Sequence, residues 1–477
     1  MKQLTLTAVL TALCLLGSGC GRVTAPAPYG PIPTPQQVAW QQMEMNLFVH
    51  FGPNTFTGRE WGLGTEAEDV FCPTDLDCRQ WASTARAAGF KGIIVTAKHH
   101  DGFCLWPNPV STHTVAQSPW KDGKGDVLKE LSEACAAEGL KFGVYISPWD
   151  RNDPHYGSPA YNEVYVKTLE SALTGYGPVF EEWFDGANGE GPNGKRQEYD
   201  WPLFHQTVRT LQPDAVMFSD VGPGCRWVGN EQGYAGQTNW SRLNIEGFTP
   251  GAGAPANEIL NTGESDGAVW LPAETDVSIR PGWFWRESEN DQVKPVRKLL
   301  DIYYTSVGRN SLLLLNVPPD TTGHLHPIDS ARLIAFREAL DRVFAEDLSD
   351  GARAQASSCR GRAFRAGNIL DGKFDSYWAP AEEAGEAEVT ILLKGTKTFN
   401  RVLLQEYIPL GQRIKSFTVE AAGPDGEWKC IAEETTVGYK RILCTDEVTA
   451  DRLRIRITDA FATPLLNGFG LYLDREE

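Results

Sequence analysis

The sequence is short of basic residues. Its 477 residues include 44 Lys and Arg against 62 Asp and Glu, which leaves a formal net charge of −18. Binding to a nucleic-acid backbone needs clustered Lys and Arg. The acidic excess therefore argues against nucleic acid as a partner and against an anionic membrane surface, and it is compatible with a neutral substrate.

Two further features are missing. No two cysteines have the C-x-x-C spacing on which many zinc sites are built. Beyond the N-terminus, no apolar run approaches the roughly 20 residues that a membrane-spanning helix needs. The composition is otherwise that of a globular protein, with 41% apolar and 22% charged residues, and the length predicts roughly two to four domains.

The N-terminus has the pattern of an export signal. Lys2 precedes a largely apolar run at residues 4–16, which is too short to span a bilayer, so we interpret residues 1–20 as a signal peptide. Small residues before Cys20 resemble a bacterial lipobox, although Gly17 stands where a large apolar residue is usual. We predict export to the periplasm or outer membrane of a Gram-negative bacterium, with membrane contact only through a lipid on Cys20.

The remaining chain divides by composition into three parts. Residues 21–35 contain five prolines and are predicted to form a stiff tether. Residues 36–346 alternate strand and helix patterns, whereas residues 350–477 show short alternating strands separated by turn signals, which predicts an all-β sandwich. The cysteine spacing offers two local disulfides in an exported protein, Cys72 with Cys78 and Cys430 with Cys444, without selecting either.

Residues 36–346 are predicted to form an α/β fold, a TIM-type (β/α)8-like barrel. Alternating strands and helices imply parallel strands, and continuous apolar strands imply burial on both faces. A doubly wound open sheet is the alternative, but it concentrates its site at one switch point, whereas here polar residues follow many successive strands. Residues 221–290 are irregular and are predicted to be long loops over a site. The predicted strands are 47–52, 93–96, 141–147, 179–184, 215–220 and 312–317, and the predicted helices are 75–88, 126–138, 162–174, 203–211 and 328–344.

Two carboxyl groups are the strongest candidates for chemistry. Asp185 ends the predicted strand 179–184 and opens into a Gly- and Asn-rich loop, and Glu231 lies among aromatic and cationic neighbours. Cutting a glycosidic bond needs one carboxylate that attacks or activates water and one carboxylic acid that protonates the leaving oxygen. The alternatives are a helix cap or loop ion pair for Asp185 and a solvated loop carboxylate for Glu231.

Histidines and tryptophans at other strand ends complete a pocket suited to a sugar. His50, His99 and His100 are three of only eight histidines, and each follows a predicted strand. They would donate and accept hydrogen bonds with hydroxyl groups; a zinc site is the alternative. Glu60 and Trp61 fall in the first loop, where a carboxylate binds hydroxyls and an indole faces a sugar ring. Trp283 and Trp285 are either walls of this pocket or core residues.

These segments resemble a known family. His50-Phe51-Gly52, His99-His100-Asp101-Gly102-Phe103 and Trp183-Phe184-Asp185-Gly186 are similar to motifs of the α-L-fucosidases of glycoside hydrolase family 29, over residues 36–345. The resemblance implies that Asp185 is the nucleophile of a retaining mechanism. It also implies that fucose is bound by His50, Glu60, Trp61, His99 and His100, with Arg226 and Trp285 as further contacts.

The segment from Arg226 to Glu231 resembles the subgroup that prefers α-1,3/1,4-linked fucose, in which this glutamate is the acid/base. The stretch from Asn368 to Trp378 is similar to discoidin-like, coagulation-factor-type carbohydrate-binding modules, which implies a possible structural Ca2+ at that loop. Whether this module binds sugar or braces the barrel is left open, with bracing favoured.

The sequence thus predicts an exo-acting retaining α-L-fucosidase that releases terminal fucose from branched glycans by double displacement, with no cofactor and no metal in the active site. Two alternatives stay open. One is a retaining exo-glycosidase for another sugar, and the other is a non-catalytic surface protein that binds glycans.

Overall fold

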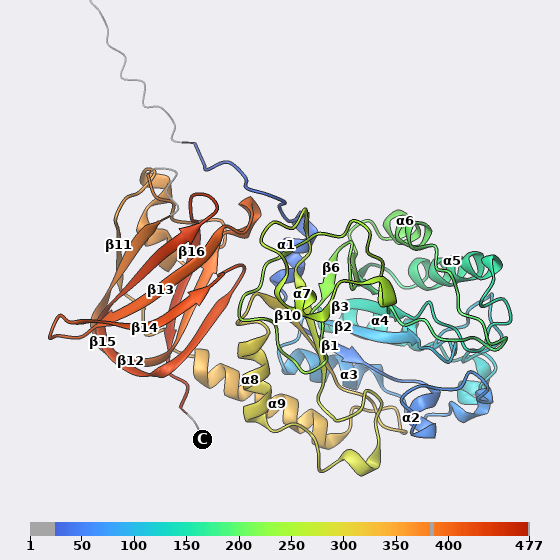
Figure 1. Cartoon of the computed structure of the whole chain (residues 1–477). Helices are drawn as coiled ribbons and strands as arrows, with labels where there is room; N and C mark the ends of the chain where they lie inside the picture. The colour runs from blue at the N-terminus through green and yellow to red at the C-terminus, as the bar shows by residue number, and fades with distance from the viewer. Residues whose placement is uncertain (1–23, 382–385, 476–477) are drawn as a thin grey trace, which may run out of the picture.

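The computed structural model describes residues 24–381 and 386–475, and within them eight parallel strands close into a barrel (Figure 1). Neighbouring strands follow the order β1, β10, β9, β6, β5, β4, β3, β2 around the barrel. This closed sheet confirms the predicted barrel and excludes the open doubly wound sheet. The strands are β1 (Met45–Val49), β2 (Gly92–Lys98), β3 (Lys141–Ile146), β4 (Val179–Trp183), β5 (Val216–Ser219), β6 (Cys225–Trp227), β9 (Ala273–Ser278) and β10 (Ser311–Asn316).

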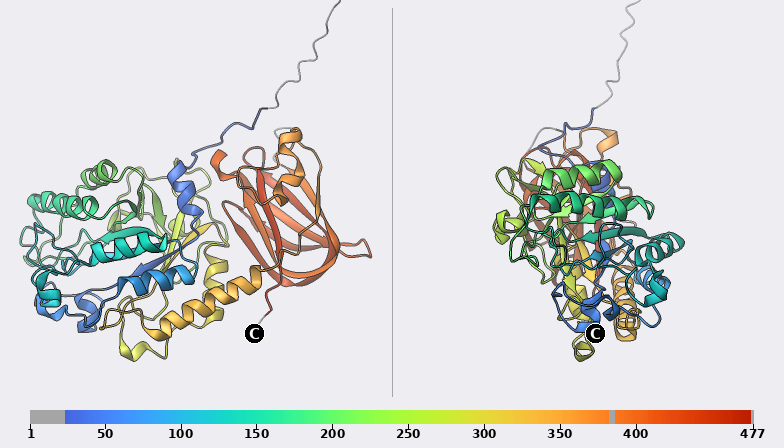
Figure 2. Two further views of the ribbon diagram at one scale, coloured as in Figure 1. Left: turned by 180° about the vertical axis from the view of Figure 1, so that it is seen from behind. Right: turned by 90° about the vertical axis from the view of Figure 1, so that its right-hand side faces the viewer.

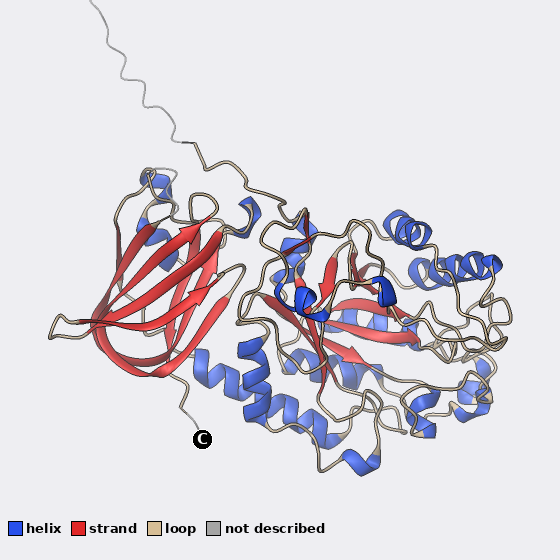
Figure 3. Ribbon diagram, viewed as in Figure 1, coloured by secondary structure: helices blue, strands red, loops and turns tan. Residues whose placement is uncertain are grey.

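Helices surround this barrel (Figure 3). Their ends carry the expected local signals: Asp77 and Asp126 accept backbone N–H groups at the starts of α3 and α4, and Gly139 ends α4 in the left-handed conformation. The helices are α1 (Pro35–Gln41), α2 (Pro53–Thr57), α3 (Cys78–Ala87), α4 (Val127–Glu138), α5 (Pro159–Thr174), α6 (Trp201–Leu211), α7 (Asn257–Thr262), α8 (Val296–Thr305) and α9 (Pro327–Phe344). Short 3-10 helices lie at Glu68–Val70, Trp120–Gly123, Gly251–Gly253, Glu287–Glu289, Arg362–Phe364, Ala366–Leu370 and Ile408–Leu410.

The irregular stretch 221–290 contributes more than loops, which corrects the prediction. It supplies β6 and β9, the strands that close the barrel between β5 and β10, and a small two-stranded sheet, β7 (Arg242–Leu243) with β8 (Val269–Trp270). Sequence patterns missed β6 because it is three residues long. They missed β9 because Glu274 and Asp276 occupy its fully buried positions, where an apolar residue would be expected.

The C-terminal region forms a separate antiparallel sheet with its own apolar core. The order is β11, β12, β15, β13, β14, and β16 pairs with β12. This agrees with the predicted β-sandwich module, although β12 joins two strands that the sequence pattern separates. The strands are β11 (Arg353–Ala356), β12 (Ala387–Glu406), β13 (Ile414–Ala422), β14 (Trp428–Thr435), β15 (Arg441–Ala460) and β16 (Leu466–Tyr472).

The module lies beside the barrel (Figure 2) and contacts residues that precede barrel strands. Tyr439 and Lys440 bond to the carboxylate of Glu44, which comes directly before β1. The backbone N–H of Tyr439 also donates to Asn310 Oδ1, directly before β10, at 2.8 Å. Because parallel strands carry active sites at their carboxyl ends, the module packs against the end of the barrel that faces away from such a site.

Other sequence predictions resolve as follows. The cysteines at 72, 78, 104, 135, 225, 359, 430 and 444 are all free thiols, so neither candidate disulfide is present in the described part of the chain. The signal peptide and Cys20 lie outside the described residues. A search of the described helices finds none with the length and hydropathy to cross a bilayer.

Candidate active site

Asp185 follows β4 and has two oxygens with different neighbours. The backbone N–H of Ala187 donates to Oδ1 at 2.7 Å, and the Tyr145 hydroxyl donates to Oδ2 at 2.9 Å. His100 Nε2 lies 3.7 Å from the same Oδ2, and the side chain of Asp185 remains 25% exposed. Hydrogen bonds therefore fix both oxygens of the carboxylate, while its partly exposed side chain remains accessible to a substrate, which a nucleophile requires.

Gly186 allows the chain to leave Asp185 in the observed direction. A Cβ at this position would lie 2.5 Å from both the backbone nitrogen of Gly251 and Asp220 Oδ2. Asp220 accepts the N–H of Gly251 at 2.6 Å, and burial, followed by the charge of Asp185, raises the pKa of Asp220 to about 6. The glycine of the Trp-Phe-Asp-Gly motif is thus needed for close packing beside the carboxylate.

The two adjacent histidines point into one site because β2 ends before them. Lys98 is the last strand residue, and the chain turns from His99 to Gly102, whose N–H donates to the His99 carbonyl at 3.0 Å. Gly102 has φ of +86°, and Asp101 accepts the N–H of Phe103 at 2.7 Å. The His99 and His100 rings consequently lie 4.2 Å apart between centroids rather than on opposite faces of a strand.

His100 is oriented by Ser147, which follows β3. The Ser147 hydroxyl donates to the Trp149 carbonyl at 3.1 Å and therefore accepts from His100 Nδ1, 2.7 Å away. This places the His100 proton on Nδ1 and leaves Nε2, on the side of Asp185, free to accept a hydrogen bond. Burial is the main cause that lowers the pKa of His100, to about 4, so the ring is neutral at neutral pH.

His50 is oriented in the same manner from the other side of the pocket. Asn316, the last residue of β10, donates through Nδ2 to Ser278 Oγ and to the Trp283 carbonyl, both at 2.9 Å. Its Oδ1 lies 2.9 Å from His50 Nδ1, which assigns the His50 proton to that nitrogen. Burial lowers the pKa of His50 to about 3, and it lowers that of His99 well below the ordinary value.

Glu60 and Trp283 connect the first loop to the loop after β9. The backbone N–H of Trp283 donates to Glu60 Oε1 at 2.5 Å, and Arg286 forms an ion pair with Glu60 Oε2. The Trp283 ring packs against His50 with a centroid distance of 5.0 Å. Trp283 therefore lies in the pocket wall, as the sequence reasoning proposed.

Glu231 joins this group through the same tryptophan. The Trp283 indole donates to Glu231 Oε2 at 3.3 Å. Burial raises the pKa of Glu231, and the charges of Asp185 and Glu60 raise it further, whereas the indole bond opposes this shift. A carboxyl group whose pKa is raised by burial and by the charge of a nearby carboxylate is suited to act as an acid catalyst.

Trp61 lies at the rim of the pocket. It is 56% exposed, and its ring meets those of His100 and Trp149 edge to face, at 5.9 and 5.5 Å. An exposed indole beside buried polar groups presents a flat apolar face to a ligand. Stacking of Trp61 on a sugar ring stays a prediction.

Two further predicted site residues are Arg226 and Trp285. The guanidinium of Arg226 is completely buried and donates to the carbonyls of Leu260 and Leu271 and to Asn239 Oδ1, so it is not available to a ligand. The Trp285 ring packs on His326, with centroids 5.9 Å apart, and its role as a further fucose contact stays a prediction.

Sequence reasoning missed several members of the pocket, namely Tyr145, Ser147, Asp220, Phe284 and Asn316. Four of them had a usable signal, because Tyr145, Ser147, Asp220 and Asn316 lie at or near the carboxyl ends of the predicted strands 141–147, 215–220 and 312–317. Phe284 had none: it packs against both His50 and His99, at 5.3 and 5.1 Å, only because its loop folds over the barrel.

The zinc alternative is not supported at the strand ends. In the described residues, the one group of three or more His, Cys, Asp or Glu whose ligand atoms approach within 4.8 Å is Glu181, Cys225 and Glu274, inside the barrel. The three histidines instead bond to Ser147 and Asn316 or pack on aromatic rings. The arrangement is that of a sugar pocket with two carboxyl groups.

Comparison with known proteins agrees with this geometry. Residues 29–341 match the model of the alpha-L-fucosidase family, and residues 353–469 match the F5/8 type C domain. Alpha-L-fucosidase 1 of Arabidopsis thaliana is 43% identical over 456 residues, which cover 94% of this chain and 89% of that protein.

Two crystal structures have the same architecture. A glycoside hydrolase 29 family member from an unknown rumen bacterium has a TM-score of 0.83 and 42% identity, covering 94% of this chain and 78% of its own. A Ruminococcus gnavus family 29 fucosidase in complex with fucose has a TM-score of 0.86 and 33% identity, covering 96% and 98% of the two chains.

Proposed function

Because the chain belongs to the alpha-L-fucosidase family and is a glycoside hydrolase, we propose that it is an exo-acting retaining enzyme with Asp185 as nucleophile and Glu231 as acid/base. The observation that carries this assignment is the pair of carboxyl groups around one pocket, in which the charge of Asp185 raises the pKa of Glu231. Its substrates are fucosylated oligosaccharides and glycoconjugates.

The first step forms a covalent glycosyl-enzyme. Asp185 Oδ2 attacks the anomeric carbon, the bond to the leaving oxygen breaks, and Glu231 gives its proton to that oxygen. In the second step Glu231 takes a proton from water, which attacks the anomeric carbon and releases Asp185. The two carboxyl groups supply both the nucleophile and the proton, so the reaction needs no cofactor.

The neutral imidazoles bind the sugar hydroxyl groups. His100 Nε2 faces the Asp185 side of the pocket without a proton and accepts from one hydroxyl, whereas Glu60 accepts from others. The Trp61 face and the Phe284 ring border the apolar side of the sugar. Phe284 is a candidate contact for the C6 methyl group that distinguishes fucose from a hexose.

The Asp185→Ala variant tests the assignment. We expect kcat on an aryl fucoside to fall by at least about 10³-fold, because no covalent intermediate can form, and azide to restore turnover in the space left by the carboxylate. Near-native kcat in this variant would remove Asp185 from the mechanism.

Asp220 is the competing acid, since it also responds to the charge of Asp185. We favour Glu231 because it lies at the exposed rim where a leaving group departs, whereas Asp220 Oδ2 is occupied by the Gly251 N–H. The Glu231→Gln variant should retain glycosylation by substrates with activated leaving groups and lose it with natural disaccharides. If Asp220→Asn shows this pattern and Glu231→Gln does not, the roles are exchanged.

The preference for α-1,3/1,4-linked fucose on branched acceptors rests on the resemblance of the segment around Glu231. Release of fucose from a Lewis-type trisaccharide, compared with 2′-linked fucosyllactose, tests it. Faster release from fucosyllactose would reject the preference. A panel of nitrophenyl glycosides separates fucose from other sugars, and no release from any glycan would favour a binding protein.

We retain export, lipidation at Cys20 and a structural Ca2+ as proposals. Asn368, Asp371 and Asp375 line one cavity of the C-terminal module and offer the oxygen ligands that calcium prefers. An EDTA-dependent fall in Tm that Ca2+ reverses would support the ion. Membrane fractionation of a Cys20→Ala variant, compared with the native chain, tests the anchor.

A further inference from the structure

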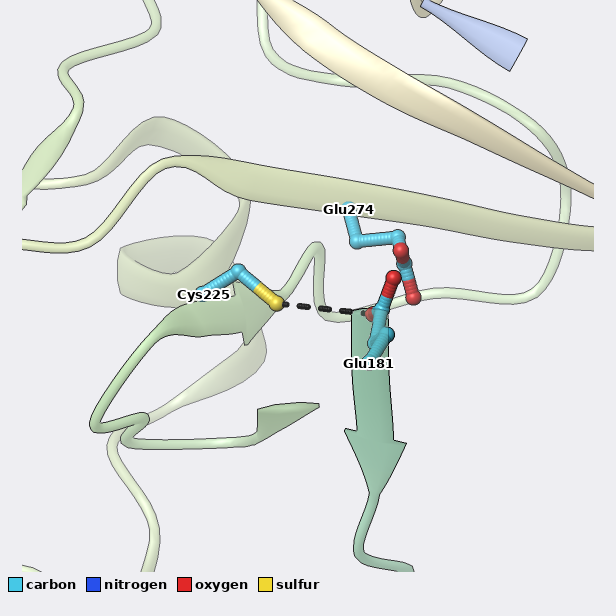
Figure 4. Close-up of side chains that lie close together, drawn as sticks. All are labelled: Glu181, Cys225 and Glu274. Atoms are coloured by element: carbon cyan, nitrogen blue, oxygen red, sulfur yellow. Dashed lines mark hydrogen bonds between the residues drawn. The ribbon is translucent and has the colours of Figure 1, made fainter. Parts of the chain in front are cut away.

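Inside the barrel, below the floor of the pocket, two glutamates from opposite parts of the sheet face each other (Figure 4). Glu181 lies on β4 and Glu274 on β9, both fully buried, with Cys225 of β6 beside them. Their carboxyl oxygens and the Cys225 sulfur all lie within 4.8 Å of one another. Nothing in the mechanism above uses these groups.

The four oxygens of the two carboxyl groups have one hydrogen-bond donor too few. Trp40 donates to Glu181 Oε2 at 2.8 Å, and the Cys225 thiol faces Oε1 at 3.8 Å. Trp183 donates to Glu274 Oε1 at 2.8 Å, but Glu274 Oε2 has no partner. No basic side chain of the described chain forms an ion pair with either carboxyl group. Two adjacent buried carboxylates without a cation repel each other strongly, and a single shared proton removes both the repulsion and the missing donor.

The pair is connected to Asp185 through aromatic rings. Trp183, which Glu274 holds, stacks on Phe218 at 3.9 Å and 8° and on Tyr145 at 5.2 Å and 28°. The Tyr145 hydroxyl in turn donates to Asp185 Oδ2. Each link is a packed, buried contact, so the indole bond to Glu274 fixes the position of the ring against which Tyr145 rests.

We propose that Glu274 is a positioning residue for the nucleophile: sharing one proton with Glu181, it holds Trp183 in the stack that aligns Tyr145 with Asp185. This inference rests on the proposed role of Asp185. Burial, followed by the interaction of the two groups, raises the pKa of Glu274 well above its ordinary value, and burial raises that of Glu181 to about 7.

A metal ion is the competing occupant, and the surrounding chemistry disfavours it. A metal would need the Cys225 thiolate, but burial raises the pKa of this thiol well above the ordinary value. The Trp40 and Trp183 N–H groups also already occupy one oxygen of each carboxyl group. A shared proton is compatible with both indoles.

The kinetic test compares Glu274→Leu with Glu182→Leu. Glu182 follows Glu181 on β4. It is as buried as Glu274, neither of its oxygens has a hydrogen-bond partner, and it lies outside the pocket. We expect Glu274→Leu to lower kcat by about 10- to 100-fold with little change in KM, since a small displacement of a reacting group has effects of this size. It should equally slow covalent trapping by an activated 2-fluoro-fucoside, a reaction that depends on Asp185. Glu182→Leu should leave both rates unchanged.

A double-mutant cycle identifies the route. If Glu274 acts through Tyr145, the Glu274→Leu/Tyr145→Phe variant should lose no more activity than the worse single variant. The effects of residues that act through the same series of contacts are not additive. Full additivity would overturn the proposal. Equal losses of kcat in Glu274→Leu and Glu182→Leu would also overturn it. In that case, loss of activity in Asp185→Ala would still support the proposed function, so the two proposals fail separately.

Glu274→Gln provides a test even if the leucine variant does not fold. Its amide oxygen still accepts from Trp183, and its N–H₂ group replaces the shared proton. A carboxyl group with a raised pKa in the folded state holds a proton that the unfolded chain releases, so native stability falls as pH rises through that interval. The other titratable side chains near this pair are Cys225, Asp276 and Glu182, and this variant leaves all three in place.

We therefore expect the Tm of Glu274→Gln to fall less between pH 5 and about 9 than that of the native chain. An unchanged pH dependence would overturn the shared proton. So would a metal other than calcium that the purified native protein carries at about one equivalent and that the Glu274→Gln variant lacks.

Discussion

Around Asp185, burial has more effect on protonation than any neighbouring charge. It lowers the pKa of His50 to about 3 and of His100 to about 4, so both rings are neutral over the pH range in which a hydrolase works. A neutral imidazole both donates and accepts, which suits it to hydroxyl groups. Among the groups proposed to touch substrate, Glu231 is then the acid whose proton controls the rate on the alkaline side.

Replacing Trp283 by Phe should move that alkaline limit. The indole bond favours the charged form of Glu231 and lowers its pKa. Without it the pKa rises further, so the acid keeps its proton to higher pH and the alkaline limb of the kcat/KM profile shifts upward. The measurement is a pH–rate profile on an aryl fucoside. A downward shift would mean that another group controls this limb.

Asn316 should be important for binding. Replacing it by Leu leaves His50 Nδ1 without its partner and removes the donors to Ser278 and Trp283. An unsatisfied buried group costs about 1–3 kcal/mol, so we expect kcat/KM to fall by about 10- to 100-fold. Asn46 is the control, because it is equally buried in the barrel and neither side-chain atom has a partner. Asn46→Leu should leave kcat/KM within about twofold; equal losses would reject a specific role for Asn316.

At the scale of elements, the turn after β2 depends on a glycine. Ala at Gly102 would have to adopt φ of +86° and place its Cβ 2.4 Å from Asp150 Oδ1. Asp150 forms a buried ion pair with Lys98 at 3.1 Å, so its displacement would disturb the last residue of the strand and the histidines that follow.

We expect Gly102→Ala to lower both Tm and kcat/KM. Gly139→Ala is the control because its φ is +69° with no atom within 4 Å of the added Cβ. It should cost only the backbone penalty, about 1 kcal/mol, and leave kcat/KM unchanged. Thermal unfolding and steady-state kinetics of both variants separate the cost of the left-handed backbone from the effect of the contact between the added Cβ and Asp150. Equal effects on kcat/KM would mean that crowding at Asp150 is unimportant.

Helices and strands whose apolar residues follow a clear pattern were predictable from the sequence, and those without such a pattern were not. The strands that end near His50 and His99 are largely apolar, the strand before Asp185 begins with Val179 and Phe180, and the helices between them carry capping residues. By contrast, β6 and β9 are recognisable only because neighbouring strands pair with them, and Glu274 and Asp276 of β9 each accept a hydrogen bond from an indole on another strand.

At the scale of the whole molecule, hydrogen bonds join the C-terminal module to residues that precede barrel strands. Asn310, with φ of +60°, accepts from the Tyr439 backbone through Oδ1 and donates to the Asn239 carbonyl and to Ser241 Oγ through Nδ2. Residues before β1 and β10 thus depend on the module for partners, which supports bracing rather than a direct contribution to the pocket.

Asn310→Gly should lower Tm without altering kcat. Glycine tolerates the left-handed conformation, so the loss comes from the side-chain hydrogen bonds, about 2 kcal/mol or more. Calorimetry and an assay well below Tm measure the two quantities. A lower kcat at unchanged Tm would instead indicate that the interface communicates with the pocket.

The alternation of strands and helices, the barrel followed by a β module, and Asp185 as the candidate nucleophile could be predicted from the sequence, because periodicity and strand-end residues are local properties. The placement of Arg226, the proton shared by Glu181 and Glu274, and the roles of Tyr145 and Asn316 were not. Those depend on which side chains meet across a closed barrel, and closure joins strands that are more than 200 residues apart, such as β1 and β10. A carboxyl group such as Glu274 acquires its protonation state from burial and from a carboxyl group on another strand, so tertiary packing alone decides its chemistry.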